Sequence, residues 1–159
     1  TQSIFDAFLG EYSEFKTFFH GHSFTANQLG AAAALESLEI LGSPSSEKSR
    51  RRIERAMRRE LKRLLVWSQV GDIRQVGLIA AVELVKDWRT REPFDAAERV
   101  GIRICEGMAK RGVLTRPVGN VIVLMPPYCT SDAQVHKMVS ALNASIEELF
   151  GRKMEKAKS

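Results

Sequence analysis

The sequence has 159 residues, of which 44% are hydrophobic and five are proline, a composition typical of a globular protein and not of a disordered chain. No apolar run approaches the roughly 20 residues that span a bilayer, and residues 1–4 lack the basic start and apolar core of a signal peptide. The net charge of +5 makes polyanions candidate partners.

The basic charge is concentrated in residues 47–63. Nine Lys or Arg residues stand there against Glu47, Glu54 and Glu60, so this segment carries +6 and the rest of the chain −1. This pattern predicts a helix whose face away from the core is cationic and exposed to solvent. A stand-alone module that binds a polyanion through this helix is the alternative, although no aromatic residues are interleaved to stack on bases.

Cysteine and histidine usage points away from disulfides and metals. Cys105 and Cys129 are too few for a disulfide framework, and neither belongs to a metal-spaced pair, so we expect a reducing, cytoplasmic setting. His20 and His22 without a neighbouring carboxylate or thiolate make a poor zinc site, and no metal is expected.

Two helices are predicted before Gly42. Apolar residues at positions 4, 5, 8 and 9 have helical spacing and precede Gly10, which favours a short helix in residues 1–14 whose packing partner need not lie in this chain. A second helix is predicted over residues 26–41, ending at Gly42.

A third helix is predicted to begin at Ser43-Pro44, because a capping hydroxyl followed by proline is a favoured helix start. It should break at Gly71-Asp72. One apolar stripe of helical period runs through it: Ile53, Met57, Leu61 and Leu64.

Residues 73–85 then read as extended, with Glu83 expected to be buried and paired. Alternate apolar residues are expected on one face: Val76, Leu78, Ala80, Val82 and Leu84. After a polar loop at 87–93, Asp95 and Glu98 form a capping box for a helix that closes at Gly112.

The last elements are a hairpin and a helix. Strands 113–118 and 121–125 flank Gly119-Asn120, a short hairpin signal, and Ser131 with Gln134 caps a helix that ends before Gly151. We expect His136 on the surface and residues 152–159 as a frayed basic tail. The apolar stripe of this helix is Val135, Met138, Val139, Leu142, Ile146 and Leu149.

The element order after Gly42 predicts the fold class. Helix, one or two strands, helix, two strands and helix suit an α/β protein of the α+β kind, with a short antiparallel-rich sheet and helices on one face. Residues 1–42 do not fit this layer. We therefore expect a domain over 43–150, a separate piece over 1–42 and a tail over 151–159.

The stretch at residues 15–36 carries the strongest functional signal. His20, Gly21, His22, Ser23 and Thr25 form a polar loop that feeds an alanine-rich helix, and such a loop can bind an anion at the helix start. An ordinary helix capped by Thr25 or Asn27 is the alternative.

The order of residues 20–29, HGHSFTANQL, followed by the alanine run resembles the segment after the cofactor lysine in class III pyridoxal-phosphate aminotransferases. Residues 76–84, VGLIAAVEL, and 112–117, GVLTRP, with their continuation to residue 128 agree with this family and come in its order. The resemblance covers roughly residues 4 to 150. It implies the C-terminal part of a fold-type I enzyme, with residues 1–42 from the large cofactor domain and 43–150 as the small domain.

Within the family the resemblance is strongest to the branch that acts in biotin synthesis. This implies transfer of an amino group from S-adenosylmethionine to 8-amino-7-oxononanoate, with pyridoxal 5'-phosphate as cofactor and the site shared with a second identical subunit. Another class III enzyme with a different amino donor, such as lysine, is the nearest alternative, and a non-functional excised fragment is a further one.

The resemblance also implies the site residues. Arg116 matches the arginine that binds the carboxylate of the amino acceptor, and Gly21 matches a glycine against the substrate. His22 and Ser23 match the turn that contacts the cofactor phosphate of the neighbouring subunit, His22 through its backbone N–H. The lysine that forms the Schiff base would lie upstream of Thr1, so this chain alone is expected to be inactive.

Overall fold

The computed structural model of the protein describes residues 1–151. The chain divides into two compact units, Thr1–Leu41 and a second unit that begins at Gly42. Each unit is described by itself below. None of the helices in the described part of the chain combines the length and apolar character that crossing a membrane requires.

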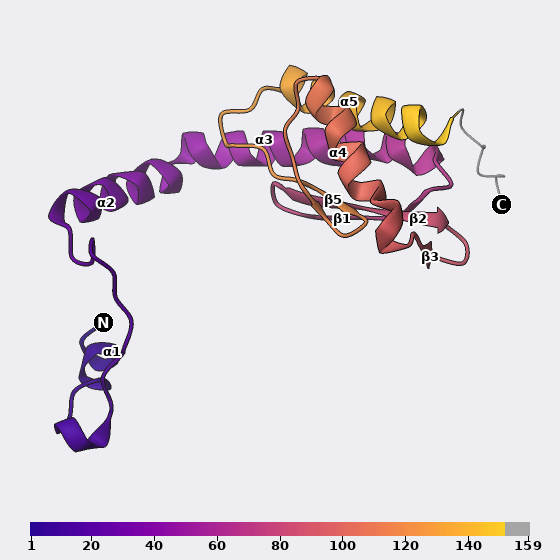
Figure 1. The fold of residues 1–159 in the computed structure, drawn as a ribbon. Helices are drawn as coiled ribbons and strands as arrows, with labels where there is room; N and C mark the ends of the chain where they lie inside the picture. Colours follow the sequence, from indigo (N-terminus) through magenta and orange to yellow (C-terminus); the bar gives the residue numbers. More distant parts are fainter. Residues whose placement is uncertain (152–159) are drawn as a thin grey trace. The chain divides into compact units, whose positions relative to one another are not determined.

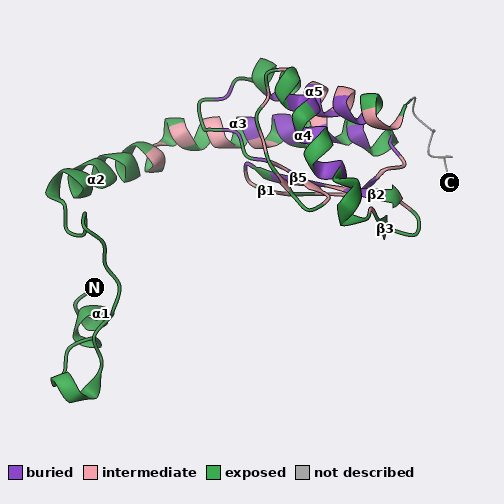
Figure 2. Cartoon of the chain, in the orientation of Figure 1, coloured by how far each residue is buried: buried purple, intermediate pink, exposed green. Residues whose placement is uncertain are grey.

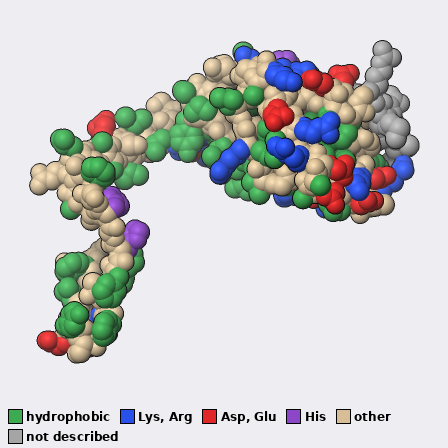
Figure 3. Space-filling view, in the orientation of Figure 1, with side chains coloured by type: hydrophobic (Ala, Val, Ile, Leu, Met, Phe, Trp, Pro, Cys, Tyr) green, Lys and Arg blue, Asp and Glu red, His purple; other side chains and the backbone are tan. Residues whose placement is uncertain are grey.

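The first unit consists of helix α1 (Gln2–Asp6), the 3-10 turn η1 (Tyr12–Glu14) and most of helix α2 (Gln28–Gly42). None of residues 1–41 is buried (Figure 2), and hydrophobic side chains gather on the surface of this unit (Figure 3). Both predicted helices are confirmed, α2 beginning two residues later than expected. Asn27 provides the start of α2, because the N–H of Gly30 donates to its Oδ1 at 2.8 Å.

The second unit opens with helix α3 (Pro44–Leu61), which is followed by the 3-10 turn η2 (Lys62–Val66). Ser43 is its N-cap and accepts from the N–H of Ser46 at 3.3 Å, as the sequence predicts. The predicted apolar stripe is also confirmed, since its four members are at most 1% exposed. The expected break at Gly71 is wrong, because the helical backbone has already ended at η2 and strand β1 begins at Val70.

The sheet is antiparallel throughout and has the order β1-β2-β5-β4, with β3 pairing on β2. Its strands are β1 (Val70–Val76), β2 (Ile79–Asp87), β3 (Glu92–Pro93), β4 (Pro117–Val118) and β5 (Val121–Leu124). Helices α3, α4 (Val100–Lys110) and α5 (Asp132–Phe150) supply the helical layer that packs on it (Figure 1). The predicted fold class is confirmed.

A tight turn divides the segment that the sequence presents as one extended run. Gly77 has φ of +55°, which glycine adopts without steric cost, and the chain reverses there to form the β1–β2 hairpin. The predicted alternation is confirmed for Leu78, Ala80, Val82 and Leu84, all of which are buried. It is wrong for Val76, which is 82% exposed because it lies before the turn.

The first strand of the β4–β5 hairpin is shorter than predicted. Gly119 takes φ of +57° in the two-residue connection, which confirms the hairpin, but only Pro117 and Val118 form strand β4. Residues 113–116 lie outside the ladder because the hydroxyl of Thr115 donates to the carbonyl of Val123. A side chain thus occupies an acceptor that a continuing backbone ladder could use.

The capping box of Asp95 and Glu98 is present but caps a different element. It closes the 3-10 turn η3 (Ala96–Glu98), where the N–H of Ala97 donates to Asp95 Oδ1 at 2.7 Å. Arg99 then adopts a left-handed conformation with φ of 52°, and α4 begins only at Val100. The predicted single helix from Asp95 to Gly112 is therefore wrong in its first turn.

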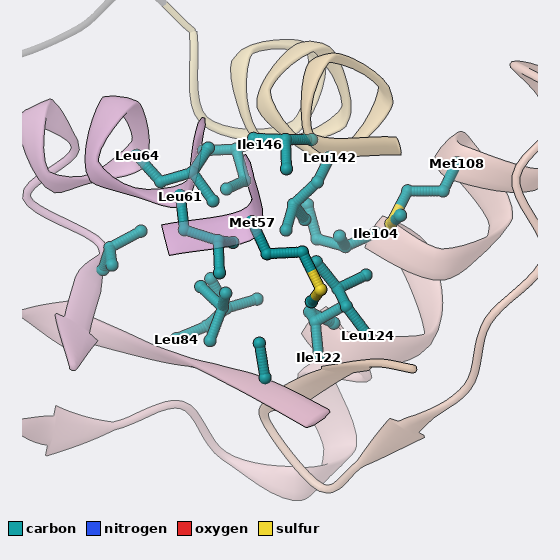
Figure 4. Close-up of a cluster of buried hydrophobic side chains, with 14 of the residues drawn as sticks. Met57, Leu61, Leu64, Leu84, Ile104, Met108, Ile122, Leu124, Leu142 and Ile146 are labelled. Carbon is teal, nitrogen blue, oxygen red and sulfur yellow. The ribbon is translucent and has the colours of Figure 1, made fainter. Parts of the chain in front are cut away.

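The core lies between the sheet and the helical layer. Side chains of α3, α4 and α5 meet the inward side chains of β2 and β5 there (Figure 4). The Ser131–Gln134 capping box and the end of α5 before Gly151 are as predicted. The predicted tail at residues 152–159 lies outside the described residues. The residues labelled in the close-up are Met57, Leu61, Leu64, Leu84, Ile104, Met108, Ile122, Leu124, Leu142 and Ile146.

Candidate functional site

The polar loop before α2 folds into a compact turn over residues 20–27, here called the histidine turn. The N–H of His22 donates to Thr25 Oγ1 at 2.9 Å, and the N–H of Thr25 donates to the carbonyl of His22 at 2.9 Å. The His22 ring accepts from the N–H of Phe24 through Nδ1 at 3.1 Å. Both the backbone donor and the ring of His22 are therefore engaged inside the turn.

Ser23 and Gly21 stay available at the surface of this turn. Within the described residues, the Ser23 hydroxyl has no hydrogen-bond partner, and the residue is exposed. A Cβ on Gly21 would meet only Thr25 Oγ1, at 3.8 Å, so the glycine is not required by packing in this unit. The turn lines a hollow of about 690 Å³, large enough for a small ligand or a side chain of a neighbour.

Arg116 lies just before β4, in the second unit. It is exposed, and its guanidinium has no ion pair or hydrogen bond with any residue that the structure describes. Pro117 beside it faces helix α4, because a Cβ on Gly101 would meet the Pro117 Cβ at 2.8 Å. Arg116 itself precedes the first paired residue of β4 and is exposed to solvent.

A second arginine of this unit, Arg74 on β1, is already neutralised. Arg74 donates to Glu83 at 2.5 Å and to Asp72 at 2.9 Å, and these bonds, with Glu83 the stronger influence, raise the pKa of Arg74 above its ordinary value. This pair supplies the partner that the sequence could not name for Glu83. The Glu83 side chain is 31% exposed, so it is partly buried as well as paired.

Much of the charge on the basic helix is internally paired. Arg52 reaches out of the helix to Asp132 and to the carbonyl of Thr130, which ties α3 to the start of α5. The remaining pairs lie along α3 and η2: Arg51 with Glu47 at 2.6 Å, Arg58 with Glu54 at 3.2 Å, Arg59 with Glu60 at 3.4 Å, and Arg63 with Glu60 at 2.8 Å. This arrangement fits the predicted solvated helix back, with no aromatic residues interleaved among the cations.

Glu60 is the most enclosed acidic group of this helix. Its carboxylate is only 13% exposed and accepts from Arg63 at 2.8 Å, and it contacts His136 Nδ1 on α5 at 2.9 Å. The hydrogen bond from Arg63, followed by that from His136, lowers the pKa of Glu60 below its ordinary value. His136 is 58% exposed, as predicted, and its role here is to connect two helices.

The described residues contain no metal cluster, and the buried thiol of Cys105 is not activated. Residues 1–151 hold no group of three or more His, Cys, Asp or Glu side chains that could bind a metal ion. Cys105 is buried against the core, and burial raises the pKa of its thiol to about 11. A thiol with this pKa stays protonated near neutral pH and is not a nucleophile.

Sequence and structure therefore define two groups of candidate site residues. Gly21, His22 and Ser23 share one turn of the first unit, and Arg116 is an exposed residue just before β4 in the second unit. The outward direction of Val123, which pairs with Ala81 and whose carbonyl accepts from Thr115, escaped the sequence analysis. The strand alternation of β5 carried that signal, because it sends Ile122 and Leu124 inward and Val123 outward.

Comparison with known proteins finds the same family in sequence and in structure. The family Aminotransferase class-III matches residues 3–146. A Geobacter sulfurreducens protein named adenosylmethionine-8-amino-7-oxononanoate aminotransferase is 48% identical over 151 residues, which are 95% of this chain and 33% of the relative. A protein of the same name from Anoxybacillus flavithermus is 43% identical over 148 residues, 93% of this chain and 33% of the relative.

Two solved structures agree. The adenosylmethionine-8-amino-7-oxononanoate aminotransferase of Methanocaldococcus jannaschii superposes with a TM-score of 0.81 at 36% identity, over 93% of this chain and 34% of that one. A PMP-bound aminotransferase from Vibrio fluvialis superposes with a TM-score of 0.79 at 27% identity, over 89% of this chain and 31% of that one. The chain spans about a third of the length of the curated relatives it matches. By the extent of the family match, this chain belongs to the class-III aminotransferases.

Proposed function

We propose that this chain is part of an enzyme that transfers an amino group from S-adenosylmethionine to 8-amino-7-oxononanoate, giving 7,8-diaminononanoate for biotin synthesis. The observation that carries the proposal is the 48% identity, over 95% of the chain, to a relative named for this reaction. Because the chain corresponds to about a third of that relative, the activity belongs to a longer polypeptide or assembly that includes these residues. A cytoplasmic location goes with this proposal.

Pyridoxal 5'-phosphate is the proposed cofactor, and the histidine turn suits its phosphate end. When bound, this cofactor supplies an electron sink that lets an amino group leave the donor. The Ser23 hydroxyl is a donor that a phosphate can accept from, whereas the N–H groups of His22, Phe24 and Thr25 already donate within the turn. His22 contributes its N–H only if the bond to Thr25 is given up, so Ser23 is the stronger candidate.

The lysine that bonds to the cofactor is proposed to lie outside this chain. Lys16 is near the histidine turn in sequence, but its ammonium pairs with Glu14 at 2.7 Å and its side chain is 48% exposed. A lysine that acts as a nucleophile needs a desolvated or cationic environment, which disfavours the charged form. Residues 1–42 and 43–150 would then be the end of the large domain and the small domain of the whole enzyme.

The substrate contacts are proposed to be Arg116 and Gly21. A planar guanidinium holds a carboxylate through two parallel hydrogen bonds, and Arg116, which is exposed and has no partner among the described residues, would do so for the amino acceptor. Gly21 leaves space for the substrate beside Ser23. A second identical subunit is the proposed partner. The phosphate of its cofactor would accept a hydrogen bond from the Ser23 hydroxyl of this chain.

A replacement experiment tests this function. This chain takes the place of the matching third of the Geobacter sulfurreducens relative, and the hybrid is assayed for 7,8-diaminononanoate with S-adenosylmethionine as donor. Formation of the product at a rate near that of the unmodified relative supports the proposal. Product formation with lysine but not with S-adenosylmethionine indicates the alternative amino donor. A folded, cofactor-loaded hybrid that forms no product with either donor contradicts the proposed reaction.

A further inference from the structure

A hollow of about 340 Å³, here called the hairpin hollow, lies in the second unit beside the point where the β4–β5 ladder ends. The chain before β4 and the chain after β5 line it, and these two segments do not continue the ladder. Pro126 and Pro127 lack the N–H groups that a longer ladder needs, and the N–H of Val113 donates instead to the carbonyl of Met108 at 3.0 Å. The first two turns of α5 also line the hollow.

Apolar side chains form much of the wall of the hairpin hollow. Leu124 and Pro126 are buried there, and Leu124 belongs to the core (Figure 4). Leu114 and Met125 also line the hollow, but they are 89% and 68% exposed. A ligand with an apolar body that covers these two side chains removes them from water, which favours its binding.

Thr130 is a buried polar residue of the hairpin hollow. It is 7% exposed, its N–H donates to the carbonyl of Pro127 at 3.0 Å, and its carbonyl accepts from Arg52 at 2.7 Å. Its hydroxyl has no hydrogen-bond partner among residues 1–151. The same residues hold no fully enclosed side-chain oxygen or nitrogen without a partner, so this hydroxyl keeps access to the hollow that Thr130 lines. It is therefore placed to bond to a ligand inside the hollow.

Two more donors come from α5. Gln134 and Lys137 are one turn apart on this helix, and both line the hairpin hollow. Gln134 Oε1 accepts from the N–H of Ser131 at 2.8 Å, which leaves the NH₂ group of the same amide to donate. The Lys137 ammonium has no ion pair with any described residue and lies 3.2 Å from the position that a Cβ on Gly112 would take. None of the residues that line the hollow is acidic, so its polar groups suit an anion.

We propose that the hairpin hollow binds a short aliphatic carboxylate. Lys137 neutralises the charge, and the Thr130 hydroxyl and the Gln134 amide donate to the carboxylate oxygens. The aliphatic chain covers Leu114 and Met125. The volume of the hollow is near the lower end for small-molecule sites, which favours a ligand of few carbons over a long fatty acid. This site goes beyond the proposed function, because none of the residues that line it is proposed to bind the cofactor or the amino acceptor.

The test titrates the isotope-labelled chain with sodium hexanoate and with sodium acetate to tens of millimolar and follows the amide signals by NMR. The two probes share the carboxylate, and hexanoate adds four methylenes. We expect hexanoate to bind about tenfold more tightly, which is less than full burial of these methylenes would give. The amide signals of Leu114, Gln134 and Lys137 should shift with hexanoate, whereas that of Ile79 on β2 should not. Hexylamine, which is cationic at neutral pH, should leave all four signals unchanged.

Three variants assign the contacts. Thr130→Val replaces a hydroxyl that has no protein partner by a methyl of similar shape, so the variant should stay folded and bind hexanoate several-fold more weakly. Lys137→Gln should weaken hexanoate about tenfold, because the charge-assisted contact is lost. Lys62→Gln removes another exposed lysine, on η2, and is the matched control that should leave the affinity for hexanoate unchanged.

The results that would overturn the site are specific. They are equal affinities for hexanoate and acetate, no binding of hexanoate at all, or the same signals shifting with hexylamine. An affinity for hexanoate that either Thr130→Val or Lys137→Gln leaves unchanged, or that Lys62→Gln lowers as much, also overturns it. Binding that Arg116→Ala abolishes would move the carboxylate to Arg116 and equally contradict this site. The product assay on the hybrid enzyme reports on the proposed reaction independently of all these results.

Discussion

Arg116 is exposed to solvent, and among residues 1–151 its guanidinium has no ion pair of the kind that Arg52, Arg63 and Arg74 make. In the hybrid enzyme, Arg116→Ala should raise KM for the amino acceptor about tenfold or more, because a charge-assisted bidentate contact is worth a few kcal/mol. Arg116→Lys should recover only part of this loss, since an ammonium cannot present the guanidinium fork. Steady-state kinetics with the acceptor varied give the measurement.

The control for this prediction is Arg55→Ala, another exposed arginine of the chain, which lies on helix α3. It should leave KM for the acceptor unchanged. Cofactor affinity should stay the same in all three variants. An alanine variant at position 116 with an unaltered acceptor KM would show that the guanidinium does not hold the carboxylate.

Glu60 gives a pH-dependent prediction at the same scale. Its folded-state pKa lies below the ordinary value of 4.5, so its stabilising bonds to Arg63 and His136 are fully present above pH 4.5 and are lost as pH falls through the lowered pKa. Glu60→Gln should therefore destabilise the protein by about 1 kcal/mol at pH 6 and by much less at strongly acidic pH. Urea unfolding at several pH values measures the loss of stability near neutral and at acidic pH.

The comparison for Glu60 is Glu54→Gln. Glu54 pairs with Arg58 at 3.2 Å, and the Arg58 side chain is 62% exposed, so solvent screens this pair. We expect the Glu54 variant to lose a few tenths of a kcal/mol at pH 6. Equal losses in the two variants would argue that enclosure by His136 and η2 adds nothing to the Glu60 interaction.

At the scale of elements, the stripe of α3 carries much of the stability. Met57 is fully buried where α3 meets the sheet, and Met57→Ala should lower the free energy of unfolding by about 2–5 kcal/mol. Leu35→Ala on α2, where the side chain is 69% exposed, should change it by less than about 0.5 kcal/mol. Urea denaturation of the two variants, with the same m-value, tests this difference.

Helix starts and apolar stripes were predictable because the residues that set them act locally. Ser43 and the Ser131–Gln134 pair bond to N–H groups within three positions, and α5 repeats its apolar residues at helical spacing. Strand ends were less predictable. The turn at Gly77 and the bond from Thr115 to Val123 depend on where a second strand lies, which no local pattern states.

The candidate site was likewise predictable only in part. The resemblance to class III aminotransferases identified Gly21, His22, Ser23 and Arg116 by their order in the chain, and these assignments remain proposals. The engagement of the His22 N–H by Thr25 was not predictable, since it depends on how the turn closes. Likewise, the sequence predicts a strand over 121–125 without saying which way Val123 points, and the register of β5 against β2 sends it outward.

At the scale of the whole molecule, the two units differ in how much they bury. The second unit has its own core, whereas none of residues 1–41 is buried. Limited proteolysis should therefore cut first within residues 1–30, where the backbone lacks tertiary protection, and leave α4 and α5 intact. Mass spectrometry of the early fragments identifies the sites. Early cleavage inside residues 95–149 would contradict the view that residues 43–150 are the stable folding unit.

The exposed aromatic side chains of the first unit also bear on the fate of the chain in a cell. Phe15, Phe18, Phe19 and Phe24 are each at least 62% exposed, and surfaces of this kind are what chaperones and quality-control proteases recognise. Turnover of the chain would then follow the availability of its first 41 residues and not the unfolding of the core that follows them. A polypeptide that covers those residues would lengthen the lifetime of the whole chain without adding a single contact to the sheet.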